Sequence, residues 1–248
     1  MSEELTAQTI RITGFGGDEI EAYLAVPDDA AASRGSVVVI HHMPGYDSSS
    51  KEIVRKFAAN GYAALMPNLY FREAPGASPD DAAATARANG GVPDGRLVGD
   101  VSGAADYLRA LQASNGKVGV IGYCSGGRQS FLAACSLQLD AAVDCYGACI
   151  VNAPPEGMPL KVSPIVGLSP DLSCPLLGLF GADDKFPAPE ETAKLSQALD
   201  EYGKAHEFHT YEGAGHAFFA VDRSAYRPEA ANDGWQKIWD FYGRYLAS

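Results

Sequence analysis

The segment Gly-Tyr-Cys-Ser-Gly, residues 122–126, places a cysteine midway between two glycines. An apolar run precedes this segment and a helix-like run follows it. A nucleophile on a sharp strand-to-helix turn has strained backbone angles, and glycines two residues to either side avoid clashes between β-carbons. The N-terminus of the following helix favours a thiolate. The pattern therefore predicts that Cys124 is a nucleophile.

Two other interpretations of this turn remain open. Cys124 could be an ordinary buried cysteine in a glycine-rich turn. The turn could instead bind phosphate, but the sequence has neither Gly-x-Gly-x-x-Gly nor Gly-Lys-Ser/Thr. The nucleophile interpretation gains weight if a base and an acid occur at matching places.

Candidates for the base and the acid follow two later strand-like runs. A thiol nucleophile needs a histidine, and the histidine needs a group that fixes its tautomer. His216 lies just past the run 205–213 and has small neighbours, which permit close approach to another loop. Asp183 and Asp184 follow the apolar run 174–181; either could orient the imidazole, and the other could cap the next helix. The order nucleophile, acid, histidine is that of α/β-hydrolases.

Strand-like and helix-like segments alternate along the chain, which positions these residues. Expected strands cover 9–14, 20–27, 35–42, 62–70, 117–123, 139–147, 174–181 and 205–213. Expected helices cover 48–61, 96–114, 125–136, 188–203 and 227–248, with excursions at 71–95 and 148–173. The alternation predicts an α/β fold with a mostly parallel central sheet and helices on both faces. Catalytic groups in such folds lie at the carboxyl ends of strands.

Composition limits the function classes. A chain of 248 residues with 46% hydrophobic content fits one α/β domain spanning residues 1–248. The net charge of −12 disfavours nucleic acid as a partner. The N-terminus lacks the features of a signal peptide, and no apolar run is long enough to span a membrane. Five cysteines without zinc-type spacing indicate free thiols and no metal. We expect a cytoplasmic monomer or small homo-oligomer.

Taken together, the motifs resemble those of the dienelactone hydrolase family (carboxymethylenebutenolidases) of the α/β-hydrolase fold, over nearly the whole chain. The segments that carry the resemblance are GYCSGG (122–127), NLYFREAPG (68–76), DCYG (144–147), GADDKFPAP (181–189) and EGAGHAFF (212–219). The resemblance implies a triad of Cys124, His216 and Asp184, with Asp184 preferred to Asp183 by its spacing from Gly181.

The resemblance also implies an oxyanion hole made by the backbone N–H groups of Ser125 and Met43. Members of the family carry a glutamate just before the second of these residues, and here that position is His42. As a pocket residue beside the thiol, His42 would favour a thiolate at neutral pH. Alternatively, His41 and His42 merely end a strand.

The expected substrate pocket departs from the family pattern in one further respect. The family arginine that lies four residues after the triad histidine is replaced by Ala220, and the nearest arginine is Arg223. The expected pocket residues are His42, Arg72, Tyr146, Phe218 and Arg223.

The resemblance implies a cofactor-free hydrolase that cleaves small carboxylic esters or lactones through an acyl-thioester. Two alternatives stay open: an acyltransferase or peptidase on the same fold, and a non-catalytic binder of small molecules.

Overall fold

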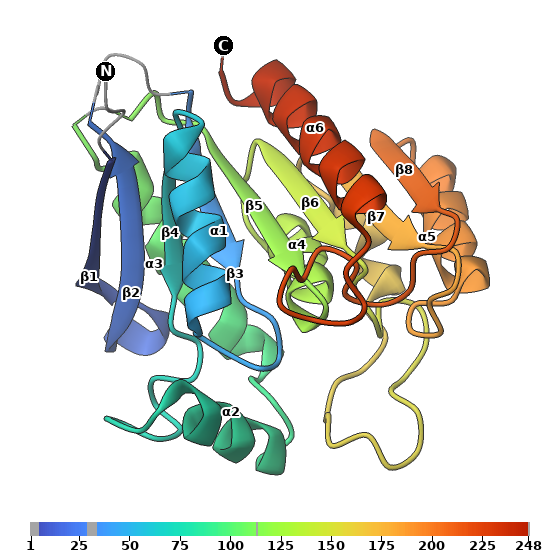
Figure 1. Cartoon of the computed structure of the whole chain (residues 1–248), viewed down its shortest axis with the longest axis horizontal. Helices are drawn as coiled ribbons and strands as arrows, with labels where there is room; N and C mark the ends of the chain where they lie inside the picture. Colours follow the sequence, from blue (N-terminus) through green and yellow to red (C-terminus); the bar gives the residue numbers. More distant parts are fainter. Residues whose placement is uncertain (1–4, 29–33, 113, 248) are drawn as a thin grey trace.

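The computed structural model describes residues 5–28, 34–112 and 114–247 (Figure 1). Residues 1–4, used above in excluding a signal peptide, and positions 113 and 248, within two expected helices, lie outside the described residues. The strands are β1 Leu5–Thr13, β2 Glu19–Pro27, β3 Ser36–Ile40, β4 Ala63–Pro67, β5 Val118–Tyr123, β6 Ala141–Cys145, β7 Leu176–Gly181 and β8 His206–Tyr211. The α-helices are α1 Ser48–Ala59, α2 Pro79–Ala88, α3 Asp94–Arg109, α4 Ser125–Ser136, α5 Pro189–Glu201 and α6 Pro228–Tyr245.

The eight strands form one sheet in the order β1-β2-β4-β3-β5-β6-β7-β8. β1 and β2 pair antiparallel, and β2 pairs antiparallel with β4. Every other neighbouring pair is parallel, from β4 and β3 through to β7 and β8. The predicted mostly parallel sheet is therefore confirmed, and the antiparallel pair lies at one edge.

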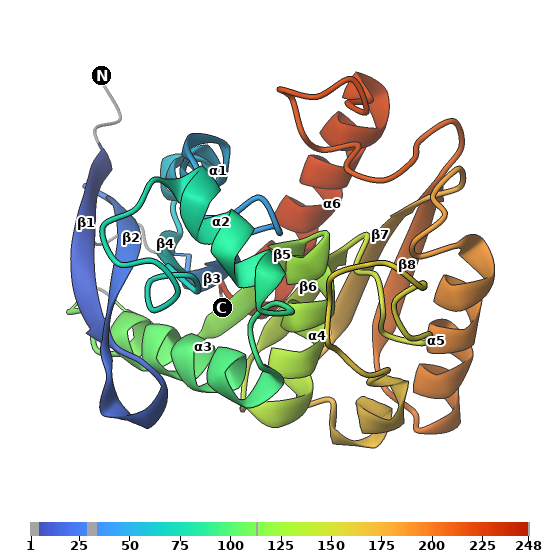
Figure 2. The same ribbon diagram turned by 90° about the horizontal axis from the view of Figure 1, so that it is seen from below.

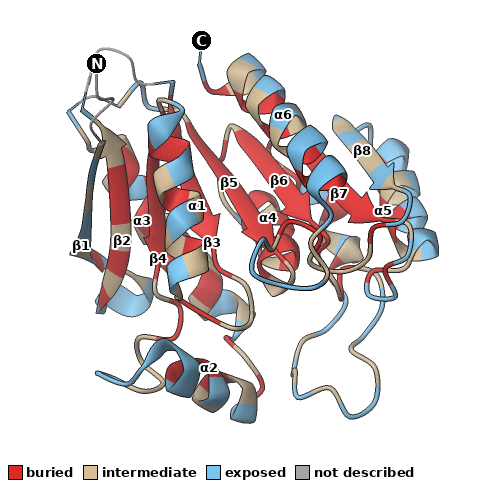
Figure 3. Cartoon of the chain, viewed as in Figure 1, coloured by how far each residue is buried: buried red, intermediate tan, exposed pale blue. Residues whose placement is uncertain are grey.

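Helices cover both faces of the sheet. Figures 1 and 2 show α1 and α6 on one face and α3, α4 and α5 on the other. The β-branched run in β3 explains this arrangement, because Val37 and Val39 pack toward the first face and Val38 and Ile40 toward the second, all fully buried. Burying each such side chain stabilises the fold by about 1.5–3 kcal/mol. The inner strands are correspondingly buried along their length (Figure 3).

Two excursions cover the carboxyl ends of the parallel strands. The first contains α2, which begins after the N-cap Ser78, whose hydroxyl accepts the N–H of Asp81 at 3.2 Å. The second is mainly irregular and contains one short 3-10 helix, Val166–Asp171. The two excursions meet where the N–H of Lys161 donates to the carbonyl of Gly90 at 2.8 Å. Together they build walls over the strand ends.

Candidate active site

Cys124 lies on the turn between β5 and α4. Its backbone has φ 58° and ψ −121°, a strained conformation for a residue with a side chain. A β-carbon on Gly122 would lie 1.8 Å from the carbonyl oxygen of Gly126, and one on Gly126 would lie 2.6 Å from that of Ile40. Both glycines are therefore required for the close packing of this turn.

The thiol of Cys124 is in contact with three groups that favour its charged form. They are the imidazole of His216 and the backbone groups of Ser125 and Met43. Burial by itself raises the pKa of the thiol, but the hydrogen bond and charge of His216 and the two backbone groups together lower it. These groups therefore make the Cys124 thiol more acidic than a free cysteine.

His216 is held from its other side by Asp184. Its Nδ1 lies 2.9 Å from Oδ2 of Asp184, and the other carboxylate oxygen accepts the N–H of Phe186 at 2.9 Å. Burial lowers the pKa of His216, but the hydrogen bonds to Asp184 and Cys124 outweigh it and raise the pKa to about 10. Asp183 is exposed, and among the described residues no hydrogen bond joins its side chain to the imidazole.

The backbone of Met43 is fixed by its neighbours. The hydroxyl of Tyr70 donates to the Met43 carbonyl at 3.0 Å, and the N–H of Gly45 closes a turn onto the carbonyl of His42 at 2.9 Å. Because the N–H groups of Ser125 and Met43 both approach the sulfur, they can also reach an oxyanion that forms on an attached carbon.

A cavity of about 520 Å³ opens above the thiol. Cys124, Ser125, Met43, Asp184 and His216 line its floor. Its walls come from α2, the segment after it, the second excursion and the loop after β7. The apolar wall residues are Val92, Ala148, Cys149, Met158, Leu160, Val162 and Phe186. A volume and lining of this kind suit a small and largely apolar ligand.

Arg128 holds the walls of this cavity together. Its guanidinium forms two hydrogen bonds with the carboxylate of Asp94, at 2.8 and 2.9 Å, and also donates to the carbonyls of Cys149 and Ser163. The side chain is 4% exposed, and these hydrogen bonds hold it within the protein. Arg128 therefore ties α4 to both excursions.

The two histidines that follow β3 have different surroundings. His41 is buried, which lowers its pKa to about 4, and its Nε2 accepts the N–H of Leu69. His42 Nε2 lies 2.7 Å from Oδ2 of Asp47, the N-cap residue of α1. Hydrogen-bond partners of the Cys124 thiol do not include His42 among the described residues. We expected His42 beside the thiol, but its imidazole pairs with Asp47 instead.

The remaining expected pocket residues do not line the cavity above the thiol, as far as the described residues show. Tyr146 is buried behind the site, where its ring packs against that of His216 with centroids 5.1 Å apart. Phe218 is fully buried and packs against Tyr146. Arg223 is exposed in the loop before α6. Tyr146 thus supports the imidazole from behind, Phe218 supports Tyr146, and neither lines the cavity.

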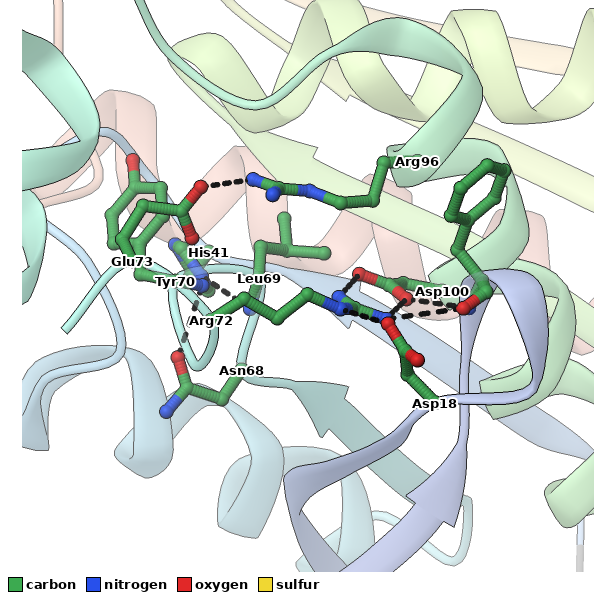
Figure 4. A network of polar contacts seen from close by, with 10 residues as sticks. Asp18, His41, Asn68, Leu69, Tyr70, Arg72, Glu73, Arg96 and Asp100 are labelled. Carbon is green, nitrogen blue, oxygen red and sulfur yellow. Dashed lines mark hydrogen bonds and ion pairs between the residues drawn. The ribbon is translucent and has the colours of Figure 1, made fainter. Parts of the chain in front are cut away.

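Arg72 requires a correction, because it points away from the cavity. Its guanidinium donates to both oxygens of Asp100, at 2.8 and 3.0 Å, and to Asp18 at 2.8 Å (Figure 4). The carboxylate of Asp100 is fully buried and also accepts the N–H of Phe15. Arg72 therefore joins α3 to the turn between β1 and β2.

We expect Arg72→Ala to lower the free energy of unfolding by about 3–5 kcal/mol, because it leaves the buried Asp100 without its cation. Urea unfolding measures this change. Arg109→Ala is the control, since its ion pair with Asp106 is exposed and long, at 3.4 Å, and its hydrogen bond to the carbonyl of Gln138 is also exposed. Equal stabilities for the two variants would contradict the structural role of Arg72.

The sequence analysis missed Arg87, which lies on α2 and lines the cavity. Its guanidinium forms no ion pair with any of the residues that the structure describes. Lys185 also lines the cavity, but it is exposed. Nothing in the alanine-rich sequence around Arg87 distinguishes it from a surface arginine; only the position of α2 over the strand ends does so.

Within the described ranges, no three His, Cys, Asp or Glu side chains come together in a way that could hold a metal ion. None of the helices in the described part of the chain combines the length and apolarity needed to cross a bilayer.

Comparison with known proteins places the chain among relatives of similar length. A model of the family described as "Dienelactone hydrolase family" matches residues 20–246. The chain is 31% identical to a carboxymethylenebutenolidase of Pseudomonas putida over 246 residues, covering 96% of both chains. It is 34% identical to a Yersinia pestis protein named "Putative carboxymethylenebutenolidase" over 236 residues, covering 94% of this chain and 86% of the relative.

A solved structure shows the same fold. The crystal structure titled "Putative Dienelactone Hydrolase" from Klebsiella pneumoniae subsp. pneumoniae MGH 78578 superposes with a TM-score of 0.85 at 29% identity, covering 98% of this chain and 100% of that one. The sheet and its flanking helices are therefore those of the α/β-hydrolase fold.

Proposed function

This chain belongs to the dienelactone hydrolase family, and from that premise we propose that it is one catalytic domain that hydrolyses small carboxylic esters or lactones through Cys124, His216 and Asp184. The observation that carries the proposal is the contact of the Cys124 thiol with the His216 imidazole at the floor of an apolar cavity. Contact of the same sulfur with the backbone groups of Ser125 and Met43 supports the acyl-transfer chemistry.

The first chemical step is acylation of the thiol. The Cys124 thiolate attacks the carbonyl carbon of the ester, and the carbonyl oxygen takes up negative charge. The N–H groups of Ser125 and Met43 donate to that oxygen, and each lowers the barrier by about 3 kcal/mol. The tetrahedral intermediate then collapses: the bond from carbon to the alkoxide oxygen breaks, and His216 gives that oxygen its proton.

Hydrolysis of the acyl-thioester completes the cycle. His216, now neutral, takes a proton from water as the water attacks the thioester carbon. The same two N–H groups hold the second oxyanion. The thiolate then leaves, and His216 keeps the proton that it took from water. Asp184 keeps the Nδ1–H tautomer of His216, so that Nε2 faces the thiol throughout. With a lactone the alkoxide stays tethered, and the reaction gives one hydroxy acid.

Release of an aryl alcohol from an activated ester tests this function. We expect a burst of one equivalent per enzyme molecule, followed by steady turnover as the acyl-thioester is hydrolysed. A binder without catalysis gives neither phase. An acyltransferase gives the burst, but its steady phase depends on an added alcohol or thiol acceptor. A panel that compares dienelactones with simple aryl esters then identifies the substrate class.

Arg87 supports a substrate that carries a carboxylate. An arginine without a carboxylate partner on the wall of an apolar cavity favours an anionic ligand group. We expect Arg87→Ala to raise KM for the 4-nitrophenyl monoester of succinate by about 10- to 100-fold, as for a lost hydrogen bond to a charged group. KM for 4-nitrophenyl butyrate, which lacks the carboxylate, should hardly change.

Arg223→Ala is the matched control for that measurement. Arg223 is exposed and does not line the cavity, so its loss should leave both KM values near wild type. If Arg87→Ala raised KM equally for both esters, Arg87 would be shaping the cavity and would not be binding a carboxylate.

A further inference from the structure

The peptide unit that joins His42 to Met43 decides where the second oxyanion donor points. Its N–H is the Met43 donor that approaches the Cys124 sulfur. The peptide is trans, so its C=O and its N–H lie in one plane and point in opposite directions. Groups that hold the His42 carbonyl in place therefore also set the direction of the Met43 N–H.

Two groups hold this carbonyl. The backbone N–H of Gly45 donates to the His42 oxygen at 2.9 Å and closes a tight turn. The imidazole of His41 is the second, with its Nδ1 also 2.9 Å from the same oxygen. A carbonyl oxygen has two lone pairs and can accept from both groups at once. One side chain thus adds to what the turn itself supplies.

The partners of His41 fix its tautomer. The backbone N–H of Leu69 can only donate, and it lies 3.3 Å from Nε2, so Nε2 carries no proton (Figure 4). The His42 carbonyl can only accept, so Nδ1 carries the proton and donates it. Burial lowers the pKa of His41 to about 4, and the ring is therefore neutral at neutral pH. His41 is thus a permanent donor to the His42 carbonyl.

The surroundings of His41 prevent the ring from turning away. The residue is 2% exposed, and its ring packs edge to face on that of Tyr70, with centroids 4.7 Å apart. The hydroxyl of the same tyrosine donates to the Met43 carbonyl at 3.0 Å. On the backbone side, a β-carbon on Gly126 would lie 3.0 Å from the His41 carbonyl oxygen, so this segment is packed tightly against α4. A donor fixed in this way needs no rearrangement when charge develops.

His41 does not contact the substrate space. It is not among the residues that line the cavity above the thiol, as far as the described residues show. Its effect on the reaction can therefore pass only through the peptide that it holds.

We propose that His41 is a positioning residue of the oxyanion hole, whose Nδ1–H keeps the Met43 N–H aimed at the oxyanion. The inference rests on the proposed function, because it assigns a role in that reaction. It also explains why a buried histidine follows β3, where an apolar residue would pack equally well.

Two substitutions separate the two hydrogen bonds of His41. An asparagine amide lies near the place of Nδ1 and can still donate to the His42 carbonyl. A glutamine amide lies near the place of Nε2 and can accept the Leu69 N–H, but it leaves the carbonyl without this donor. We expect His41→Gln to lower kcat for 4-nitrophenyl acetate by about 10- to 100-fold, as for a misplaced oxyanion donor, with KM little changed. His41→Asn should retain most of kcat.

Tyr46→Phe is the control for these variants. The Tyr46 ring also packs on that of His41, with centroids 6.5 Å apart. Among the described residues, its hydroxyl donates to neither the His42 nor the Met43 carbonyl. We expect kcat close to wild type. If His41→Asn lost as much activity as His41→Gln, the Nδ1–H would not be the group that matters.

Alkylation of Cys124 separates positioning from a general structural role. Iodoacetamide is attacked at a tetrahedral carbon, so no oxyanion forms. The limiting rate at alkaline pH, where Cys124 is fully thiolate, should therefore be the same in His41→Gln and wild type. A fall in both kcat and this limiting rate would overturn the proposal, because His41 would then only maintain the fold around the thiol. Unchanged kcat in His41→Gln would overturn it as well.

Nitrogen-15 NMR of the wild-type protein tests the hydrogen bond without any hydrolysis. The His41 signals are identified by their absence from His41→Asn. We expect the neutral Nδ1–H tautomer, and the Nε2–H tautomer would overturn the proposal. If His41→Gln does not fold, this measurement decides. Absence of ester turnover by the wild-type protein would count against the proposed function, whereas the tautomer tests the hold of His41 on the peptide in either case.

Discussion

Replacing Cys124 with alanine is expected to lower kcat for ester hydrolysis by about 10⁴-fold or more, as for the loss of a catalytic nucleophile in other acyl-transfer enzymes. The variant retains both oxyanion donors and the base, but it has no atom that can carry the acyl group. Steady-state turnover of 4-nitrophenyl acetate measures the effect, and the burst should vanish with it.

Cys149→Ala is the matched control for the nucleophile. Cys149 lines the same cavity, so its replacement tests whether the loss of activity is specific to Cys124. Burial raises its pKa, so it is a protonated thiol at neutral pH. We expect kcat close to wild type. Retained burst kinetics in Cys124→Ala would show that another group is the nucleophile.

The same site chemistry predicts selective alkylation of Cys124. Its pKa is lowered, whereas burial raises that of Cys135 to about 12 and that of Cys174 to about 12. Iodoacetamide should therefore label Cys124 first at neutral pH, and its rate should fall as pH decreases through the lowered pKa, because the thiolate is then protonated.

His42→Gln should leave that pH profile of alkylation unchanged. His42 is paired with Asp47 and is not a hydrogen-bond partner of the thiol, so His216 and the backbone groups of Ser125 and Met43 favour the thiolate without it. A shifted profile would show that His42 acts on the nucleophile after all.

The nucleophile turn could be predicted from the sequence because its requirements are local. The clash that excludes a β-carbon at Gly122 involves Gly126, four residues away. Likewise, Asp184 lies just past the apolar strand β7 and His216 just past β8, and parallel strands bring their carboxyl ends to one edge. Short-range rules were therefore enough to name Cys124 and His216 as candidates and to narrow the acid to Asp183 or Asp184, and the family resemblance chose Asp184.

The substrate pocket could not be predicted in this way because long-range packing decides it. The direction of Arg72 is set by Asp100, 28 positions away, and by the turn at Asp18. Arg87 faces the cavity because α2 packs over the strand ends, through Ala82, Ala83 and Ala86. Neither of these arrangements has a local sequence signal.

Asp184→Asn is expected to lower kcat by about 10⁴-fold, as in other triads that lose their carboxylate. The carboxylate of Asp184 accepts Nδ1–H of His216 and leaves Nε2 to face the thiol. An asparagine amide that turns its N–H₂ toward the ring instead stabilises the opposite tautomer, in which Nε2 carries the proton and cannot accept another. KM should change little, because Asp184 acts through His216 and not on the substrate.

A pH profile separates this positioning role from a merely structural one. Asp184 helps to raise the pKa of His216 to about 10, and the imidazolium in turn lowers the pKa of Cys124. Loss of the carboxylate charge should lower the first pKa and raise the second, so the alkylation profile of Cys124 should move to higher pH. Asp183→Asn, which alters an exposed neighbour, should leave both kcat and the profile near wild type. The reverse ranking of the two variants would assign the orienting role to Asp183, whereas a loss of kcat with an unmoved profile would mean that Asp184 only maintains the loop after β7.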